Sequence, residues 1–468
     1  VDVTRQGIPS YTMVGLAEGA VRESKERVLS ALKNSGYKLP SARITVNLAP
    51  ADVRKGGSGY DLPLALALLA AADVLPEGAE KLLSQTYISG ELSLDGRVKP
   101  VPGVLPMAML AREEGCLGML TPHANAAEAA VVKGLTVYPV DTLSRAVAHF
   151  SSEPIEPAAE TIISSPERAL QDSLLDFVEV KGQEFAKRAI EIAAAGRHNL
   201  MFVGPPGSGK TMLARRIPTV LPPLTFEEAL DVTRIYSVAN LLGKEQALVT
   251  ERPFRAPHHT ISDAGLVGGG HIPKPGEVSL AHRGVLFLDE LPEFKKAVLE
   301  VLRQPLEDGS VTISRAAMSV TFPANLMLVA AMNPCPCGHL GDTAHECRCG
   351  PGQVQRYQSR ISGPLLDRID MHVEVPAVPY KDLKSTRTGS GSGEMRERVC
   401  VARERQAIRY KGSSIISNAE LSGKYLDRYC QLKQEHHSFL ENVVQRLGLS
   451  ARAYTRILRV ARTIADLE

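Results

Sequence analysis

The feature that most constrains this chain is the run Gly-Pro-Pro-Gly-Ser-Gly-Lys-Thr at 204–211, which fits the phosphate-binding loop pattern. Apolar residues at 200–203 precede it and a helix-forming run begins at Met212, so a strand leads in and a helix leaves. Backbone N–H groups of such a loop turn toward an anion, and the helix N-terminus adds positive dipole charge. The run therefore predicts an ATP site. The residues expected to bind it are Gly204, Pro205, Pro206, Gly207, Ser208, Gly209, Lys210 and Thr211.

Two carboxylates follow an apolar run at 285–288. Such a run is typical of a strand that is buried on both faces of a parallel sheet. At its end, Asp289 is expected to hold Mg²⁺ together with Thr211, and Glu290 to orient and deprotonate the attacking water. Lys210 is expected to reach the β- and γ-phosphates.

A second apolar run, at 326–332, ends in Asn333. A side-chain amide at that position is suited to contact the γ-phosphate and to position water. The alternative is an asparagine that caps a loop before Pro334.

Length and charge limit what the rest of the chain does. With 468 residues we expect two or three domains, and a net charge of +2 means that any nucleic-acid contact comes from a local patch. The longest apolar stretch, 62–72, contains Pro63 and is too short to span a bilayer. We expect a cytoplasmic protein without a membrane segment.

Composition divides the chain into segments of an α/β protein. Residues 1–150 alternate strand-like runs (43–48, 85–89, 135–138) with helical ones (18–33, 64–72, 107–114), and a polar, proline-bearing linker is predicted at 151–169. Residues 170–383 form the nucleotide-binding core with a parallel sheet. A Ser/Gly-rich stretch at 384–393 then precedes a helical segment at 394–468.

Four of the seven cysteines lie within fifteen residues, as Cys-Pro-Cys and Cys-Arg-Cys pairs separated by nine residues. Two such pairs suit tetrahedral Zn²⁺, and four protein ligands leave no open position, so we predict a structural zinc site. His339 and His345 are substitute ligands. Reduced or redox-active thiols are the alternative. The predicted zinc ligands are Cys335, Cys337, Cys347 and Cys349.

The order of these motifs resembles that of AAA+ ATPases of the magnesium-chelatase and MCM-helicase branch. The run Pro-Leu-Leu-Asp-Arg-Ile-Asp at 364–370 is similar to their arginine-finger segment, and Leu-Ser-Ala-Arg at 449–452 to their second sensor. The resemblance implies that Arg368 reaches the γ-phosphate of a neighbouring subunit, and that Arg452 lies on a helical lid. In isolation, Arg368 would be a surface ion pair and the arginines of 450–462 a solvated helix face.

The N-terminal segment resembles the proteolytic domain of Lon, most clearly at 88–103. Lon-type peptidases use a Ser–Lys dyad, in which the lysine activates the hydroxyl. Here the lysine position falls at Leu105 and the serine position near Gly59. We therefore expect an α+β scaffold without protease chemistry.

Runs at 46–52 and 193–199 extend a resemblance over essentially the whole chain, to the bacterial ComM/YifB group of magnesium-chelatase-like proteins. That resemblance implies a hexameric helicase that hydrolyses ATP and drives branch migration while incoming DNA recombines with the chromosome. The second hypothesis is a chelatase-type motor that remodels a partner enzyme. An ATP-dependent protease is disfavoured because the dyad is missing.

Residues 309–322 read as a β-hairpin around Arg315. In the helicase branch a hairpin at this place lines the central channel, which makes Arg315 the candidate DNA contact. An ordinary surface hairpin is the alternative. A Gly- and Pro-rich insertion at 252–274 carries His258 and His259, which are also candidates to face the channel.

Overall fold

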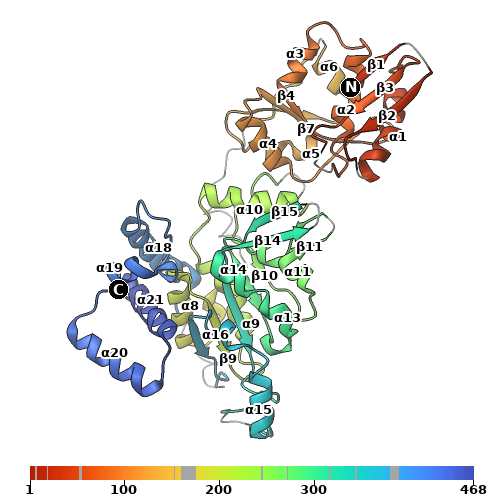
Figure 1. Cartoon of the computed structure of the whole chain (residues 1–468). Helices are drawn as coiled ribbons and strands as arrows, with labels where there is room; N and C mark the ends of the chain where they lie inside the picture. The colour runs from red at the N-terminus through yellow and green to blue at the C-terminus, as the bar shows by residue number, and fades with distance from the viewer. Residues whose placement is uncertain are drawn as a thin grey trace. The chain divides into compact units, whose positions relative to one another are not determined.

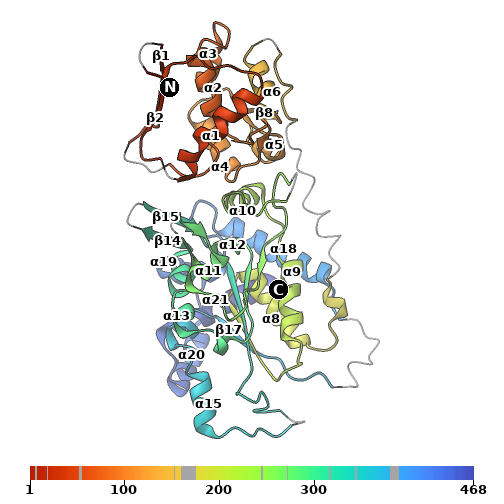
Figure 2. The ribbon, with the colours of Figure 1, turned by 90° about the vertical axis from the view of Figure 1, so that its right-hand side faces the viewer.

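The computed structural model (Figures 1 and 2) describes residues 1–5, 8–17, 19–51, 55–151, 153–159, 175–243, 246–270, 272–315, 318–342, 345–379 and 389–468. The chain forms two compact units. One comprises Val1–Ser164 and Ala229–Val249, and the other Ser165–Glu228 and Thr250–Glu468. Most of the predicted linker, and residues 384–388 of the predicted Ser/Gly-rich stretch, lie outside the described residues.

The first unit contains two three-stranded sheets and a short hairpin. In one sheet β3 lies between β1, which is antiparallel to it, and β2, which is parallel. The other sheet is parallel, in the order β4-β7-β8. The strands are β1 (Asp2–Thr4), β2 (Ser10–Val14), β3 (Arg43–Asn47), β4 (Thr86–Ile88), β5 (Glu91–Leu92), β6 (Val98–Lys99), β7 (Gly118–Pro122) and β8 (Thr136–Val140).

Helices cover these sheets and supply most of the buried leucines and alanines of the first unit. The predicted helices and strands at 18–33, 64–72, 107–114, 43–48, 85–89 and 135–138 correspond to α1, α2, α4, β3, β4 and β8. The helices are α1 (Gly19–Asn34), α2 (Asp61–Ala71), α3 (Ala79–Ser84), α4 (Val104–Glu113), α5 (His123–Ala129) and α6 (Leu143–His149).

The two positions where a Ser–Lys dyad was sought lie at α4 and just before α2. Leu105 is fully buried in α4, and the carbonyl oxygen of Gly59, which precedes α2, accepts a hydrogen bond from Gly90 N at 3.1 Å. A buried leucine has no base to offer a hydroxyl. The Lon-type fold of this unit stays a prediction.

The second unit is built on a five-stranded parallel sheet in the order β10-β13-β16-β9-β17. Its core has two halves, one on each face: Phe202, Phe287 and Val329 pack on one side, and Met201 and Leu286 on the other. All residues of β13 and β16 are buried, as expected of strands covered on both faces. The strands are β9 (Leu200–Val203), β10 (Phe254–Arg255), β13 (Val285–Leu288), β16 (Met327–Met332) and β17 (Met371–Glu374).

Helices and short hairpins surround this sheet, whereas α10 (Phe226–Val238) belongs from Ala229 onward to the first unit. The predicted hairpin is confirmed: β14 and β15 pair antiparallel from Ser310↔Pro323 to Arg315↔Met318. Its tip, residues 316–317, lies outside the described residues. The elements are η1 (Phe177–Glu179), α8 (Glu184–Gly196), α9 (Lys210–Val220), α10 (Phe226–Val238), α11 (Asp263–Val267), β11 (Gly268–Gly269), β12 (Lys274–Pro275), α12 (Glu277–Leu280), η2 (Leu291–Glu293), α13 (Lys296–Glu300), α14 (Arg303–Asp308), β14 (Ser310–Arg315), β15 (Met318–Pro323), α15 (Pro351–Gln358) and α16 (Gly363–Leu366).

The C-terminal segment is helical and packs on the same sheet-bearing unit. Met395, Val399 and Ala402 of α18 belong to the core that contains β9 and α9. In α21, Thr463 Oγ1 lies 2.8 Å from His198 Nε2, and Asp466 is buried against Arg409. The elements are α18 (Ser392–Arg409), η3 (Asn418–Glu420), α19 (Gly423–Tyr429), α20 (Gln434–Leu447) and α21 (Ala451–Leu467).

Among the described helices, none combines the length and the apolar composition that crossing a membrane requires.

Candidate nucleotide site

The phosphate loop connects the carboxyl end of β9 to the first turn of α9 (Figure 1). The strand and helix that the sequence predicted on either side of it are therefore confirmed. Gly204 has no room for a side chain, because an added Cβ would lie 2.1 Å from the carbonyl oxygen of Val375. Gln183, which the sequence did not single out, donates from Nε2 to Ser208 O at 3.4 Å and to Pro376 O at 2.6 Å.

Lys210 lies in a cradle of uncharged acceptors. Its Nζ donates to the carbonyl oxygens of Gly204 and Pro205, both at 2.8 Å, and to Asn333 Oδ1 at 3.2 Å. Burial lowers the pKa of this ammonium group, and the negative charge of Asp289 offsets only part of that effect. A buried cation held by neutral dipoles gains from a nearby anion, so the loop fits a phosphate group.

Thr211 and Asp289 meet at the start of α9. Thr211 Oγ1 donates a hydrogen bond to Asp289 Oδ2 at 2.7 Å. A hydroxyl and a carboxylate are the oxygen ligands that Mg²⁺ prefers, and Mg²⁺ usually takes only one or two of them from protein. The donor set therefore fits the cation that the sequence predicted.

Glu290 has an unusual backbone, with φ 52° and ψ 47°. A left-handed conformation is uncommon for a residue other than glycine and is concentrated at functional sites. The backbone N of Glu290 donates to Asp289 Oδ1 at 2.9 Å, and its side chain is 59% exposed. The carboxylate of Glu290 is therefore accessible to water.

His259 contacts this carboxylate: its Nδ1 lies 3.5 Å from Glu290 Oε2. Its neighbour His258 instead faces Thr260 Oγ1 at 3.0 Å. The sequence offered both histidines only as candidates for a channel surface. His259 comes close to Glu290 because it follows β10, whose neighbour in the parallel sheet is the strand that leads to Glu290, and no pattern in the sequence shows that pairing.

Asn333 follows β16, which pairs with both β13 and β9. Because the carboxyl ends of parallel strands share one edge, Asn333, Asp289 and the phosphate loop come together there. The hydrogen bond from Lys210 to its side-chain oxygen favours the interpretation as a phosphate-side residue over the loop cap.

The two predicted arginines lie elsewhere, around a cavity of about 670 Å³. Asn199, Leu326 and Asp370 also line this cavity, and each of them precedes a strand of the parallel sheet. The cavity therefore lies at the amino ends of the strands, opposite the edge that carries the phosphate loop.

Within this cavity, Arg368 is 16% exposed and its guanidinium pairs with Glu307. Arg452 is 66% exposed and lies 3.8 Å from Asp367 Oδ2. Arg456 is held more firmly, because its Nη1 donates to Ile369 O at 2.8 Å. The structure thus brings Arg368 and Arg452 to one cavity and leaves Arg452 the more accessible of the two helix arginines.

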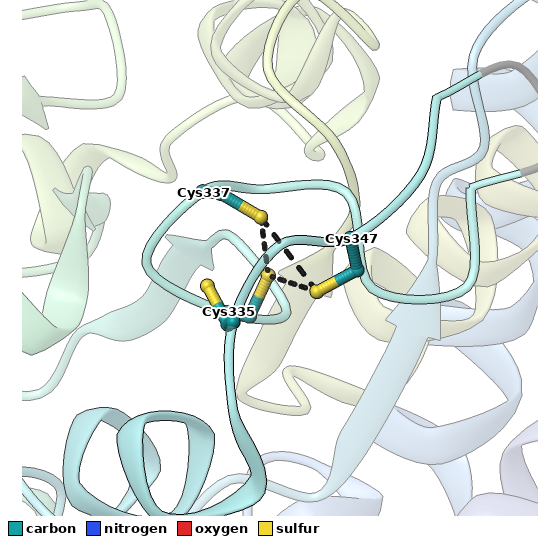
Figure 3. Close-up of side chains that lie close together, drawn as sticks. Cys335, Cys337 and Cys347 are labelled. Carbon is teal, nitrogen blue, oxygen red and sulfur yellow. Dashed lines mark hydrogen bonds between the residues drawn. The ribbon is translucent and has the colours of Figure 1, made fainter.

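The four clustered cysteines have their sulfur atoms within 4.8 Å of one another. Figure 3 shows three of these sulfurs pointing toward one point: Cys335 Sγ lies 3.4 Å from Cys337 Sγ and 3.7 Å from Cys347 Sγ. Tetrahedral zinc with Zn–S bonds near 2.3 Å places its sulfurs about 3.8 Å apart. These three thiols and the thiol of Cys349 therefore fit one Zn²⁺ ion.

The cysteine loop also contacts the phosphate loop. A Cβ added at Gly338 would lie 2.5 Å from Pro206 Cδ. Gly338 sits between the two cysteine pairs, so any ion bound there would fix a segment that packs against the nucleotide site. Sequence spacing showed that the loop starts near Asn333 but not that it touches Pro206.

Arg315 lies at the end of β14, and its Nε donates to Gly270 O at 3.3 Å. That bond connects the hairpin to the neighbouring β11–β12 turn. The proposal for Arg315 therefore rests on its place in the hairpin.

A phosphate loop after an inner strand of a parallel sheet, with a Thr–Asp pair and an exposed Glu at the same edge, is the arrangement of a P-loop ATPase of the AAA+ class. Families described as subunit ChlI of Mg-chelatase, as magnesium chelatase subunit ChlI, and as its C-terminal part match residues 1–125, 176–383 and 389–468. The chain is 47% identical to the competence protein ComM of Haemophilus influenzae, over 99% of this chain and 89% of that protein. It belongs to the ComM/YifB group of magnesium-chelatase-like proteins.

Two further relatives show that the similarity is high within this group and lower to a magnesium-chelatase subunit. YifB of Salmonella typhimurium is 44% identical over 99% of this chain and 88% of its own length. The magnesium-chelatase 67 kDa subunit of Chlorobaculum parvum is 27% identical, over 45% of this chain and 28% of its own length. The resemblance stated from the sequence is thereby confirmed at the level of the family.

Proposed function

We propose that this chain is the subunit of a hexameric ring motor that hydrolyses ATP and acts on DNA. The observation that carries the proposal is the separation of the two halves of its site within one chain. Arg368 and Arg452 lie at the amino ends of the strands, and the phosphate loop lies at their carboxyl ends. A four-residue strand such as β9 spans about 13 Å. An arginine side chain at the amino end of the strand is too short to reach the phosphate loop at the carboxyl end. These arginines would therefore complete the site of a neighbouring copy.

In this proposal each residue at the nucleotide has a distinct task. Lys210 binds the β- and γ-phosphates, and Thr211 and Asp289 hold Mg²⁺, which neutralises phosphate charge when bound. Glu290 takes a proton from the attacking water, while Asn333 orients that water. Arg368 of the neighbouring copy leaves its ion pair with Glu307 and stabilises the negative charge on the transferred phosphoryl group.

Action on DNA is supported by two observations of different kinds. The relative that matches over nearly the full chain is named a competence protein, and competence concerns the uptake of DNA. The β14–β15 hairpin offers Arg315 at the end of a strand, and a ring would present several copies of it to a phosphate backbone. On this basis we propose branch migration in homologous recombination during natural transformation as the activity.

The second candidate is a chelatase-type ATPase that remodels a partner protein. It is favoured by the match of the core to the family described as magnesium chelatase, subunit ChlI. In that case the same hydrolysis would respond to a protein and not to DNA.

ATP hydrolysis by the purified protein, measured with single-stranded, forked and four-way-junction DNA, tests the proposal. We expect branched DNA to raise the rate several-fold, and Arg315→Ala to reduce that stimulation while the rate without DNA is unchanged. Glu290→Gln should abolish the rate on every substrate and serves as the background control. A rate that ignores all DNA but rises with a protein partner would replace this proposal with the chelatase-type one.

A further inference from the structure

The cysteine loop contains a second set of metal-ligand side chains between its two cysteine pairs. His339 Nδ1 lies 3.0 Å from Asp342 Oδ2, and His345 Nδ1 lies 3.2 Å from the same oxygen. Ligand atoms of the three residues are all within 4.8 Å of one another, and the set shares no member with the cysteine cluster. The centroids of the two imidazole rings are 4.8 Å apart, and the ring planes are tilted by 41°.

These distances match a first coordination shell. Zn–N and Zn–O bonds of 2.0–2.1 Å in tetrahedral geometry separate neighbouring ligand atoms by about 3.3 Å. Two hydrogen bonds from imidazole N–H groups to one carboxylate also satisfy these distances. A divalent cation would replace those two protons and bind the same two nitrogens and the same carboxylate oxygen. The hydrogen-bonded and the metal-bound forms of the three residues would therefore have nearly the same geometry.

We propose that His339, Asp342 and His345 form a second metal site, separate from the four cysteines, for a divalent cation of the Zn²⁺ type. Imidazole and carboxylate ligands suit Zn²⁺, Co²⁺ and Ni²⁺, whereas four thiolates select Zn²⁺ more strongly. Three protein ligands leave a coordination position open. His345 is 68% exposed and Asp342 is 6% exposed, so one ligand lies at the solvent and another is fixed inside.

The two sites of the loop therefore differ in how firmly they hold an ion. The cysteine site is closed, because its four ligands fill a tetrahedron. The histidine site is open and solvent-accessible, so its ion exchanges. One loop would carry a permanent ion and an exchangeable one, and the same loop packs on the phosphate loop through Gly338 and Pro206.

The test is metal content and Zn²⁺ titration of the full chain after dialysis against a weak chelator. We expect the dialysed protein to take up one further equivalent of Zn²⁺ in a calorimetric titration. Asp342→Asn keeps the size of the side chain but removes its charge, and His345→Ala changes an exposed position. Each should weaken that uptake by at least about 100-fold, since even outer-shell changes at metal sites cost 10- to 100-fold. His123→Ala, at an exposed histidine of the first unit, is the matched control and should leave the uptake unchanged.

Titration with Co²⁺ separates this inference from the prediction for the cysteines. Co²⁺ in the histidine site should give ligand-field bands without the strong thiolate charge-transfer band that a cysteine site produces. Uptake without that band supports the second site even where the cysteines hold no zinc. The inference is overturned if the dialysed wild-type protein takes up no further equivalent, or if Asp342→Asn binds it as tightly as wild type.

Discussion

At the scale of single residues, the contact between His259 and Glu290 leads to a prediction about catalysis. The imidazole lies 3.5 Å from the carboxylate that is proposed to activate water, and so limits where that carboxylate points. We expect His259→Ala to lower kcat of ATP hydrolysis about tenfold, a part of the 10²- to 10⁴-fold that a general base contributes, without changing the KM for ATP. Steady-state ATP hydrolysis measures both.

The neighbouring histidine is the control for that prediction. His258 faces Thr260 and not Glu290, so His258→Ala removes the same side chain from the same segment. It should leave kcat near the wild-type value. Equal losses in the two variants would show that the segment, and not the contact with Glu290, matters.

The sequence was most informative about the individual residues around the phosphate loop. Gly204, Lys210 and Asp289 belong to a motif whose spacing encodes its geometry, so their meeting could be predicted. The contact of His259 could not, because it depends on which strand lies beside β13 in the sheet. Strand order is set by packing across the whole unit, and no local pattern records it.

At the scale of secondary-structure elements, the cysteine loop is expected to act on the phosphate loop through Gly338. Substitution by alanine would drive a Cβ to within 2.5 Å of Pro206 Cδ, so one of the two loops has to move. We expect Gly338→Ala to weaken ATP binding about tenfold, because the backbone N–H groups of the phosphate loop lose their alignment. Titration with a fluorescent ATP analogue measures the affinity.

Gly341 provides a matched control for this prediction. Its φ of 79° is close to the 85° of Gly338, so alanine brings the same backbone strain at both positions. A Cβ at Gly341, however, has no atom within 4 Å. Gly341→Ala should therefore bind ATP as wild type does, and an equal loss in both variants would assign the effect to backbone strain in the loop.

The elements themselves were largely predictable, and their grouping was not. Apolar runs of four to seven residues predicted β9, β13 and β16, because strands buried on both faces need apolar residues at every position. The segment Ala229–Val249 was expected within the nucleotide-binding core, but it clusters with the first unit. There Leu230 packs against the core of α4 and α5. An amphipathic helix shows which of its faces is buried but not which partner buries it.

At the scale of the whole molecule, surfaces of the second unit are consistent with a ring. Helix α20 has no buried residue, and its Phe439 and Leu447 side chains are 67% and 65% exposed. Arg452, at 66% exposure, is likewise accessible from outside the chain. Exposed apolar residues on a helix, together with an exposed arginine that lies at the strand ends opposite the phosphate loop, suit an interface with another copy.

A composite site makes a quantitative prediction for mixtures of two inactive variants. Lys210→Ala removes the phosphate side of a site and Arg368→Ala removes the arginine side, so each variant alone should lose hydrolysis. In a ring assembled from equal amounts of both, a site is intact wherever the phosphate loop of an Arg368→Ala subunit meets Arg368 of a Lys210→Ala subunit. Random head-to-tail assembly makes about one quarter of the sites intact, and the mixture should recover a comparable share of wild-type ATP hydrolysis.

Mixing either variant with Glu290→Gln tests the two sides of the site separately. Glu290 lies at the phosphate edge, so Glu290→Gln should complement Arg368→Ala but not Lys210→Ala. If no mixture recovers activity under conditions where light scattering shows mixed rings, Arg368 acts within its own subunit and the proposed ring site is wrong.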